Sequence, residues 1–195
     1  MPRTERPTRP ELLKDFTSHE LRKAFGKFAT GVTVVTCQRP DGIPHGATVN
    51  AFTAVSLEPP LAQVTLIRTN KACEYLARTP FAINIMASHQ LEICLNFAGI
   101  KQKDEIQWRE SNGVPILEDN AATLICQPWR TYDGGDHLIV IGEVTRIEVN
   151  ETDPLLFLSG KFRHPGRFVQ GTPWEGSGDC QSFGWLEEPS TFAPF

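Results

Sequence analysis

A long β-hairpin is the feature that most constrains how this chain can fold. Two apolar-rich segments, 121–132 and 137–149, flank the turn Asp133-Gly134-Gly135-Asp136. Glycine-rich turns of this kind join neighbouring antiparallel strands. Leu138–Ile141 is apolar on both faces, whereas apolar and polar residues alternate from Val144 onward. We therefore expect the second strand to begin in the middle of a sheet and to end with one face in water.

The rest of the chain also favours strands over helices. β-Branched and apolar runs predict strands at 32–37, 46–57, 61–67, 81–86 and 154–158. Helical spacing predicts helices at 18–28 and 88–98, and Arg68-Thr69-Asn70-Lys71 is expected to open another helix that runs through Arg78. The polar segment 99–120 is expected to form loops. Because helices do not regularly separate the strands, this order favours a mainly β fold, a closed or split antiparallel barrel, over a doubly wound α/β sheet. The sequence has no G-x-G-x-x-G, so a dinucleotide would not bind in the Rossmann manner.

The two ends of the chain differ from its middle. The first ten residues hold three Arg and three Pro, and we expect 1–17 to form a mobile arm. A capping box, Thr17-x-x-Glu20, then begins the first helix. Residues 18–162 are expected to form one domain. The last segment, 163–195, is rich in Gly, Pro and large aromatics, and we expect it to pack on the domain or on a dimer partner.

A stretch of small and hydroxyl residues, Gly46–Pro60, is the strongest candidate for a ligand site. Thr48, Asn50 and Ser56 offer side-chain hydrogen-bonding groups, while Gly46 and Ala51 would let a ligand approach the backbone. A flat, polar-edged ring such as a flavin needs close backbone amides at its edge and an apolar wall for its face. A Ser/Thr-rich strand of an ordinary barrel has the same composition, so the residues alone leave both interpretations open.

Three further positions have a functional and a structural interpretation. Arg68-Thr69-Asn70-Lys71 can hold a phosphate at a strand-to-helix junction, but local sequence favours a solvated turn with an Asn cap. Asn84 interrupts an apolar strand, so its amide must bind either core backbone or a ligand. His137 follows a Gly-Gly turn, where a histidine is more often simply an exposed hairpin residue.

Composition excludes several classes of function. The 195 residues carry a formal net charge of −4, which argues against a nucleic-acid surface. No apolar run approaches the roughly 20 residues of a membrane helix, and the N-terminal segment has no signal-peptide core, so we expect no membrane association. Five widely spaced cysteines give no metal-binding pattern and suit reduced thiols in the cytoplasm.

Five segments, taken together and in order, resemble the short-chain flavin reductases, the reductase components of two-component flavin-dependent monooxygenases. They are F-A-T-G-V-T-V-V-T at 28–36, G-A-T-V-N-A-F-T-A-V-S-L-E-P-P-L at 46–61, F-A-I-N-I at 81–85, G-D-H-L-I-V-I-G-E-V at 135–144 and P-L-L-F-L-S-G-K-F at 154–162. The resemblance implies an antiparallel Greek-key split barrel of the FMN-binding type, assembled as a homodimer that holds FMN or FAD.

The same resemblance implies a role for particular residues. It places the flavin against Gly46, Thr48, Val49, Asn50, Ala51, Phe52, Ser56 and Asn84, the flavin phosphate against Arg68, Asn70 and Lys71, and the nicotinamide against His137 and Phe162. This sequence departs from the family pattern at Ala51, where Ser is frequent, and at Phe157 and Phe162, where Tyr is frequent. Ala51 removes one hydrogen bond to the flavin, and Phe162 removes a hydroxyl beside the nicotinamide.

The function implied is an NAD(P)H:flavin oxidoreductase that supplies reduced flavin to a monooxygenase. His137 would be the catalytic residue, positioning the nicotinamide of NADH or NADPH first and supplying a proton second. Two alternatives remain open at this stage: a flavin-binding split barrel without turnover, and an oxidase resembling pyridoxamine-phosphate oxidase. The sequence does not distinguish FMN from FAD or NADH from NADPH.

Overall fold

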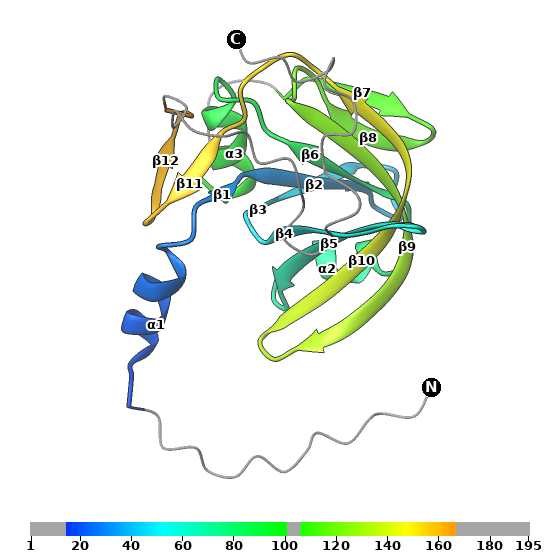
Figure 1. Ribbon diagram of the computed structural model, residues 1–195. Helices are drawn as coiled ribbons and strands as arrows, with labels where there is room; N and C mark the ends of the chain where they lie inside the picture. The colour runs from blue at the N-terminus through cyan, green and yellow to red at the C-terminus, as the bar shows by residue number, and fades with distance from the viewer. Residues whose placement is uncertain (1–14, 101–105, 167–195) are drawn as a thin grey trace. The chain divides into compact units, whose positions relative to one another are not determined.

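The computed structural model describes residues 15–100 and 106–166, which form fifteen helices and strands (Figure 1). The helices are α1 (Ser18–Phe25), α2 (Ala72–Leu76) and α3 (Leu91–Phe97). The strands are β1 (Thr30–Gly31), β2 (Thr33–Gln38), β3 (Pro44–Val49), β4 (Phe52–Leu57), β5 (Pro60–Ile67), β6 (Phe81–Ile85), β7 (Trp108–Ser111), β8 (Val114–Leu117), β9 (Ala122–Gly134), β10 (His137–Val149), β11 (Leu156–Leu158) and β12 (Lys161–Arg163).

The chain divides into two units, Met1–Pro165 and Gly166–Phe195. The second unit, with the predicted aromatic extension, lies almost wholly outside the described residues, as does most of the predicted N-terminal arm. No helix of the described ranges is long and apolar enough to cross a membrane.

The main sheet has seven antiparallel strands in the order β3-β2-β6-β9-β10-β5-β4 (Figure 1). Its two outer strands, β3 and β4, are consecutive in the chain and are joined by Asn50 and Ala51 alone. That link spans no more than about 11 Å, whereas a flat seven-stranded sheet would hold its outer strands about 29 Å apart. The sheet must therefore curl until its edges meet, which makes it a barrel.

Two hydrophobic cores lie on the two sides of β2. Alternate residues of the barrel strands, such as Val35, Val64 and Phe81, fill its interior together with Leu76 of α2. The neighbouring strand residue Val34 instead packs with Met86 and Cys94 in a second core beneath α3. Because both faces of β2 are covered, Thr33–Cys37 is buried throughout.

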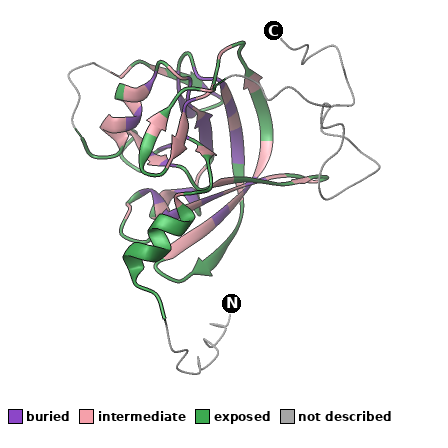
Figure 2. Cartoon of the chain, turned by 60° about the vertical axis from the view of Figure 1, so that its left-hand side comes forward, coloured by how far each residue is buried: buried purple, intermediate pink, exposed green. Residues whose placement is uncertain are grey.

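The predicted hairpin is confirmed. β9 and β10 pair along nearly their whole length and turn through Gly135 and Asp136, with Gly135 at a positive φ of 81°. The predicted capping box is also present, with Thr17 Oγ1 accepting from the Glu20 amide and the Glu20 carboxylate accepting from the Thr17 amide. The predicted amphipathic helix, however, buries none of its residues (Figure 2).

Two predictions about local structure were wrong. The stretch 46–57 is not one strand, because the chain leaves the β3 edge at Asn50 and enters the β4 edge at Phe52. The segment 99–120 is not only loop, because β7 and β8 form a hairpin within it and Val114–Leu117 is fully buried. These apolar residues cover the barrel between β2 and β6, which is why a segment with a polar beginning still forms strands.

Gly142 of β10 offers a test of how tightly the barrel is packed. A Cβ at this position would lie 2.6 Å from the Phe81 ring and 2.7 Å from Cys126 Cβ. We expect Gly142→Ala to lower the free energy of unfolding by about 1–3 kcal/mol, since overpacking a filled core forces its neighbours to move. Urea denaturation measures the loss. Gly31→Ala is the matched control, because nothing lies within 4 Å of that position and its stability should change by less than about 0.5 kcal/mol.

Candidate functional site

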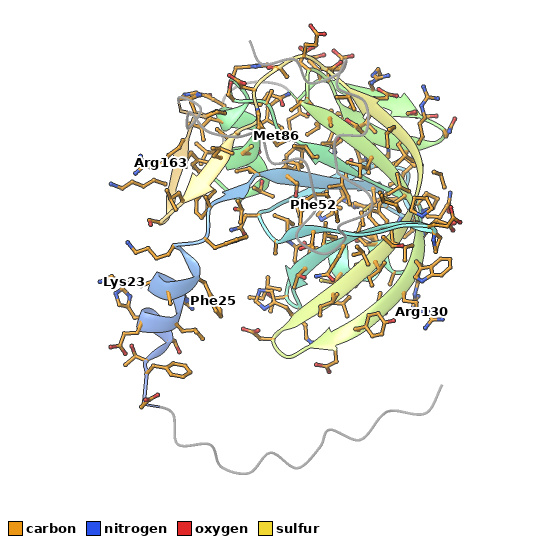
Figure 3. The ribbon with its side chains drawn as sticks, viewed as in Figure 1. Lys23, Phe25, Phe52, Met86, Arg130 and Arg163 are labelled. Carbon is orange, nitrogen blue, oxygen red and sulfur yellow. The ribbon has the colours of Figure 1, made fainter. Side chains whose placement is uncertain are left out.

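The two-residue link Asn50-Ala51 between β3 and β4 is called the seam below. The predicted flavin residues around it fall into a buried group and an accessible group. Asn50 and Ala51 are exposed at the seam itself, and Ser56 is half-buried farther along β4. Phe52 packs against the barrel core and forms an apolar wall next to the seam (Figure 3). Val49 is buried, so its side chain contributes to the core rather than to a surface.

Two other residues of the stretch are in contact with α3. The Thr48 hydroxyl donates a hydrogen bond of 2.6 Å to the carbonyl oxygen of Cys94. A Cβ on Gly46 would meet the Phe97 ring at 2.5 Å, so this glycine is required for helix packing. The predicted role of Gly46, to let a ligand approach the backbone, does not fit this geometry. Among the predicted flavin residues of this stretch, the accessible ones are therefore Asn50, Ala51, Phe52 and Ser56.

The predicted phosphate loop combines a helix cap with free positive charge. Asn70 Oδ1 accepts a 2.9 Å hydrogen bond from the Ala72 amide at the start of α2, which is the capping role that local sequence favours. Lys71 is exposed, and no carboxylate of the described residues forms an ion pair with it. Arg68, in contrast, is bonded to the tip of the β9–β10 hairpin.

The end of β5 and the start of β10 bring the two predicted ligand sites together. His137 pairs with Ile67 across the sheet, so the imidazole lies beside the loop that begins at Arg68. His137 Nδ1 is 2.7 Å from a carboxylate oxygen of Asp136. The hydrogen bond and the charge of the imidazole lower the pKa of Asp136 below its ordinary value. Asp136 is therefore ionised at neutral pH and favours the proton on Nδ1.

Asn84 is not accessible to a ligand. It is fully buried, and its amide NH₂ donates to the Val34 carbonyl at 2.8 Å and to Thr36 Oγ1 at 3.0 Å. Its oxygen accepts from the Leu117 amide at 3.2 Å and from Asn120 Nδ2 at 3.1 Å. Because all four hydrogen-bonding positions of the amide are taken by the protein, the predicted flavin contact at Asn84 does not fit the structure.

Phe162 lies in a different sheet from His137. It belongs to β12, and its ring packs edge-to-face on Phe157 with the centroids 5.2 Å apart. Both rings contact the second core rather than the barrel interior. No described contact joins Phe162 to His137, so its predicted place beside the nicotinamide remains a prediction.

In the described part of the chain, no metal centre marks the site. The described residues contain no group of three or more His, Cys, Asp and Glu side chains that could hold a metal ion. Two surface hollows share His89 and Asp119, and they contain none of the predicted ligand residues. What the geometry offers is an open seam of small residues next to an apolar wall, with a cation-bearing loop and a histidine hairpin, an arrangement suited to a flat anionic cofactor.

Comparison with known proteins identifies the family. Residues 25–166 match the flavin reductase like domain. This chain belongs to the flavin reductase-like family. An NADH-dependent flavin reductase from a Rhodococcus species is 37% identical over 172 residues, covering 86% of this chain and 97% of that protein. The reductase subunit HsaB of a flavin-dependent monooxygenase from Rhodococcus jostii (strain RHA1) is 36% identical, covering 83% of this chain and 85% of that protein.

The native-state structure of the flavin reductase PheA2 resembles this flavin reductase-like chain with a TM-score of 0.75 and 40% identity, covering 78% of this chain and 100% of that one. The predicted family and the predicted antiparallel split-barrel fold are thereby confirmed.

Asp133 and Asp136 are the site residues that sequence reasoning missed. Each flanks the Gly-Gly pair of the hairpin, and each is bonded to a residue that was singled out, Arg68 or His137. The acidic pair was visible in D-G-G-D, but it was interpreted only as a turn. The local sequence does not show the β5–β10 register, which brings Arg68 to Asp133.

Asn84→Ala tests whether the amide is structural. Removing it takes one hydrogen bond from each of four buried partners, so we expect the free energy of unfolding to fall by about 2–4 kcal/mol. Flavin affinity, measured by fluorescence titration under conditions where the variant is folded, should change by less than about threefold. A large loss of flavin affinity with unchanged stability would instead place Asn84 in contact with the cofactor.

Proposed function

We propose that this protein is an NADH-dependent flavin reductase, transferring hydride from the reduced nicotinamide to FMN or FAD. The observation that carries the proposal is the 37% identity to an NADH-dependent flavin reductase across 97% of that protein's length. The open seam, which carries small residues and no charged side chain at Asn50–Phe52, supports it. NADPH in place of NADH is the less favoured form, since NADH is the co-substrate in the relative's name.

In this proposal the seam binds the flavin ring. Asn50 and Ala51 have exposed side chains, and the Ala51 carbonyl is already bonded to the Thr65 amide at 3.0 Å, which holds the seam backbone in place. Phe52 forms the apolar wall, and Ser56 lies toward the ribityl chain. Gly46, Thr48 and Val49 support the seam from behind, through α3 and the core.

The protein's own part in the reaction is to position the two ligands. The flavin and the nicotinamide supply the redox chemistry when bound. Fixed backbone amides at the seam would stabilise negative charge on the edge of the flavin ring. His137, which interacts with Asp136 through Nδ1, leaves Nε2 to contact the nicotinamide side, and so it acts in positioning.

Reduced flavin would be used by a separate monooxygenase. The relative HsaB is the reductase subunit of a flavin-dependent monooxygenase, and its similarity covers 83% of this chain. We propose a cytoplasmic location, which the four free cysteines of the described residues support. The alternatives, a non-catalytic flavin-binding barrel and an oxidase resembling pyridoxamine-phosphate oxidase, are not favoured by these relatives.

We also propose that two copies assemble as a homodimer. The α1 helix has only eight residues and is too short to be stable alone in water. Its Phe25, labelled in Figure 3, lies on the same side of the helix as Leu21. Phe25 is 69% exposed, and Phe28 just beyond the helix is 78% exposed. Ile139 and Ile141 on the outer face of β10 are only half-buried. A second copy would cover these apolar surfaces.

The function is tested by NADH oxidation followed at the nicotinamide absorbance band, with FMN, FAD or riboflavin as acceptor. Rapid NADH consumption that depends on added flavin is the expected result. Flavin binding without NADH consumption would favour the non-catalytic alternative, and NADPH would be compared in the same assay.

Lys71→Ala tests the phosphate position. Lys71 is the exposed cation of the loop without a carboxylate partner among the described residues, and charge-assisted contacts contribute about 1.5–3 kcal/mol. We expect FMN affinity to fall about tenfold or more, while riboflavin, which lacks the phosphate, is little affected. Lys161→Ala, in β12, is the control and should change neither. An equal loss for both flavins would argue against the phosphate role.

Phe25→Asp tests the dimer. A carboxylate in a buried apolar contact is strongly unfavourable, so sedimentation at micromolar concentration should shift from dimer to monomer. Lys23→Asp changes the same helix two residues earlier, on another side, and should leave the dimer intact. A wild-type chain that sediments as a monomer with flavin bound would refute the assembly.

A further inference from the structure

Arg68 is bonded to three residues of the hairpin tip. Its backbone amide donates to the Asp136 carbonyl at 3.0 Å, and its side-chain Nε donates to the Gly135 carbonyl at 2.8 Å. One terminal nitrogen of the guanidinium lies 3.1 Å from an Asp133 carboxylate oxygen. A single residue at the end of β5 therefore spans the whole turn between β9 and β10.

The turn needs such a contact more than most turns do. Gly135 lies in the turn and Gly134 directly precedes it, and glycine loses more conformational freedom on folding than any other residue. Asp133 restrains the turn from within, since its second oxygen accepts from the Gly135 amide at 2.8 Å. Arg68 adds the restraint from outside the hairpin.

The residue that this restraint positions is His137. It directly follows the turn, it pairs with Ile67 next to Arg68, and its Nδ1 interacts with Asp136, whose carbonyl Arg68 also holds. We propose that Arg68 is a positioning residue for the nicotinamide side of the site, acting through the hairpin tip on His137, and that Asp133 is its partner in this role. The inference rests on the proposed flavin reductase activity.

This role differs from the phosphate contact that the family resemblance implies for Arg68. Nε and one terminal nitrogen are already used by the hairpin, whereas Lys71 nearby forms no ion pair with any carboxylate in 15–100 or 106–166. The two roles predict opposite effects when the negative charge of Asp133 is removed. If Arg68 serves an anionic ligand directly, removing the negative charge of Asp133 strengthens ligand binding. If Arg68 serves the hairpin, the same change weakens the use of NADH.

Riboflavin separates the two roles of Arg68, because it has no phosphate. With riboflavin as acceptor, we expect Arg68→Ala to raise the KM for NADH by about fivefold or more, the effect of about one hydrogen bond, with a smaller change in kcat. Asp133→Asn keeps an oxygen for the Gly135 amide but removes the ion pair. It should raise the same KM about two- to fivefold, as expected for an exposed ion pair, without weakening FMN. Arg109→Ala, which removes another exposed Arg–carboxylate ion pair, that with Glu148 and away from the site, is the matched control and should leave the riboflavin reaction unchanged.

Hydrogen exchange gives a readout that does not depend on activity. In Arg68→Ala and Asp133→Asn the amides of 133–137 should exchange faster, while those at the far end of the hairpin, 122–126 and 144–149, keep their wild-type rates. Faster exchange along the entire hairpin would show a general loss of stability and would overturn the positioning role.

The kinetics can overturn the proposal in two further ways. Wild-type KM for NADH in Arg68→Ala with riboflavin, together with a loss of FMN affinity, would assign Arg68 to the phosphate alone. A lower KM for NADH in Asp133→Asn would show that Arg68 contacts the dinucleotide directly. If the wild-type protein oxidises no NADH with any flavin, the proposed function itself fails, and that result is distinct from either of these.

Discussion

The two-residue link between β3 and β4 is the constraint on which the rest of the structure depends. Asn50 and Ala51 must connect the opposite edges of the main sheet, so the sheet closes there. At this closure each of the two edge strands pairs with a neighbouring strand on one side only. Bulky side chains at this point would hinder closure, which explains the small residues around it. The same small residues leave space for a flat ligand. Barrel closure and ligand access therefore both require small residues at this point of the sequence.

A buried polar cluster fixes the layer that lies over the barrel. Asn84 links β2, β6 and the end of β8, and Asn120 extends the cluster to Thr123 of β9. Buried polar groups are favourable only when they are hydrogen-bonded, so the four bonds of Asn84 require one arrangement of these strands. Thr36 connects it to the β7–β8 hairpin through a hydrogen bond of 2.5 Å to the Pro115 carbonyl. The polar residue that interrupts the strand thus specifies the fold rather than the ligand.

Local sequence predicted the elements whose cause is local. The β9–β10 hairpin follows from its Gly-Gly turn, and the start of α1 follows from the Thr17–Glu20 box. The β7–β8 hairpin had a local signal as well, Asn112-Gly113, and both residues adopt the positive φ of a tight hairpin turn. The corner at Asn50 had none, because it depends on which distant strands form the sheet edges. The division of the site into accessible and buried residues is also long-range: Gly46 is packed by Phe97, fifty-one positions later in the chain.

The distribution of charge follows from the chemistry that the family performs. Hydride transfer between two bound cofactors needs no side-chain nucleophile and no paired acid and base, so the seam can be built from uncharged residues. Charged groups lie instead at Lys71, where we propose that a cation holds the flavin phosphate, and between Arg68 and Asp133, which hold a flexible turn. Both clusters lie at the end of β5, because the β5–β10 register places the strand's last residues against the hairpin tip. One register thus sets the distance between the phosphate loop and His137, and a shift of one residue would separate the two halves of the site.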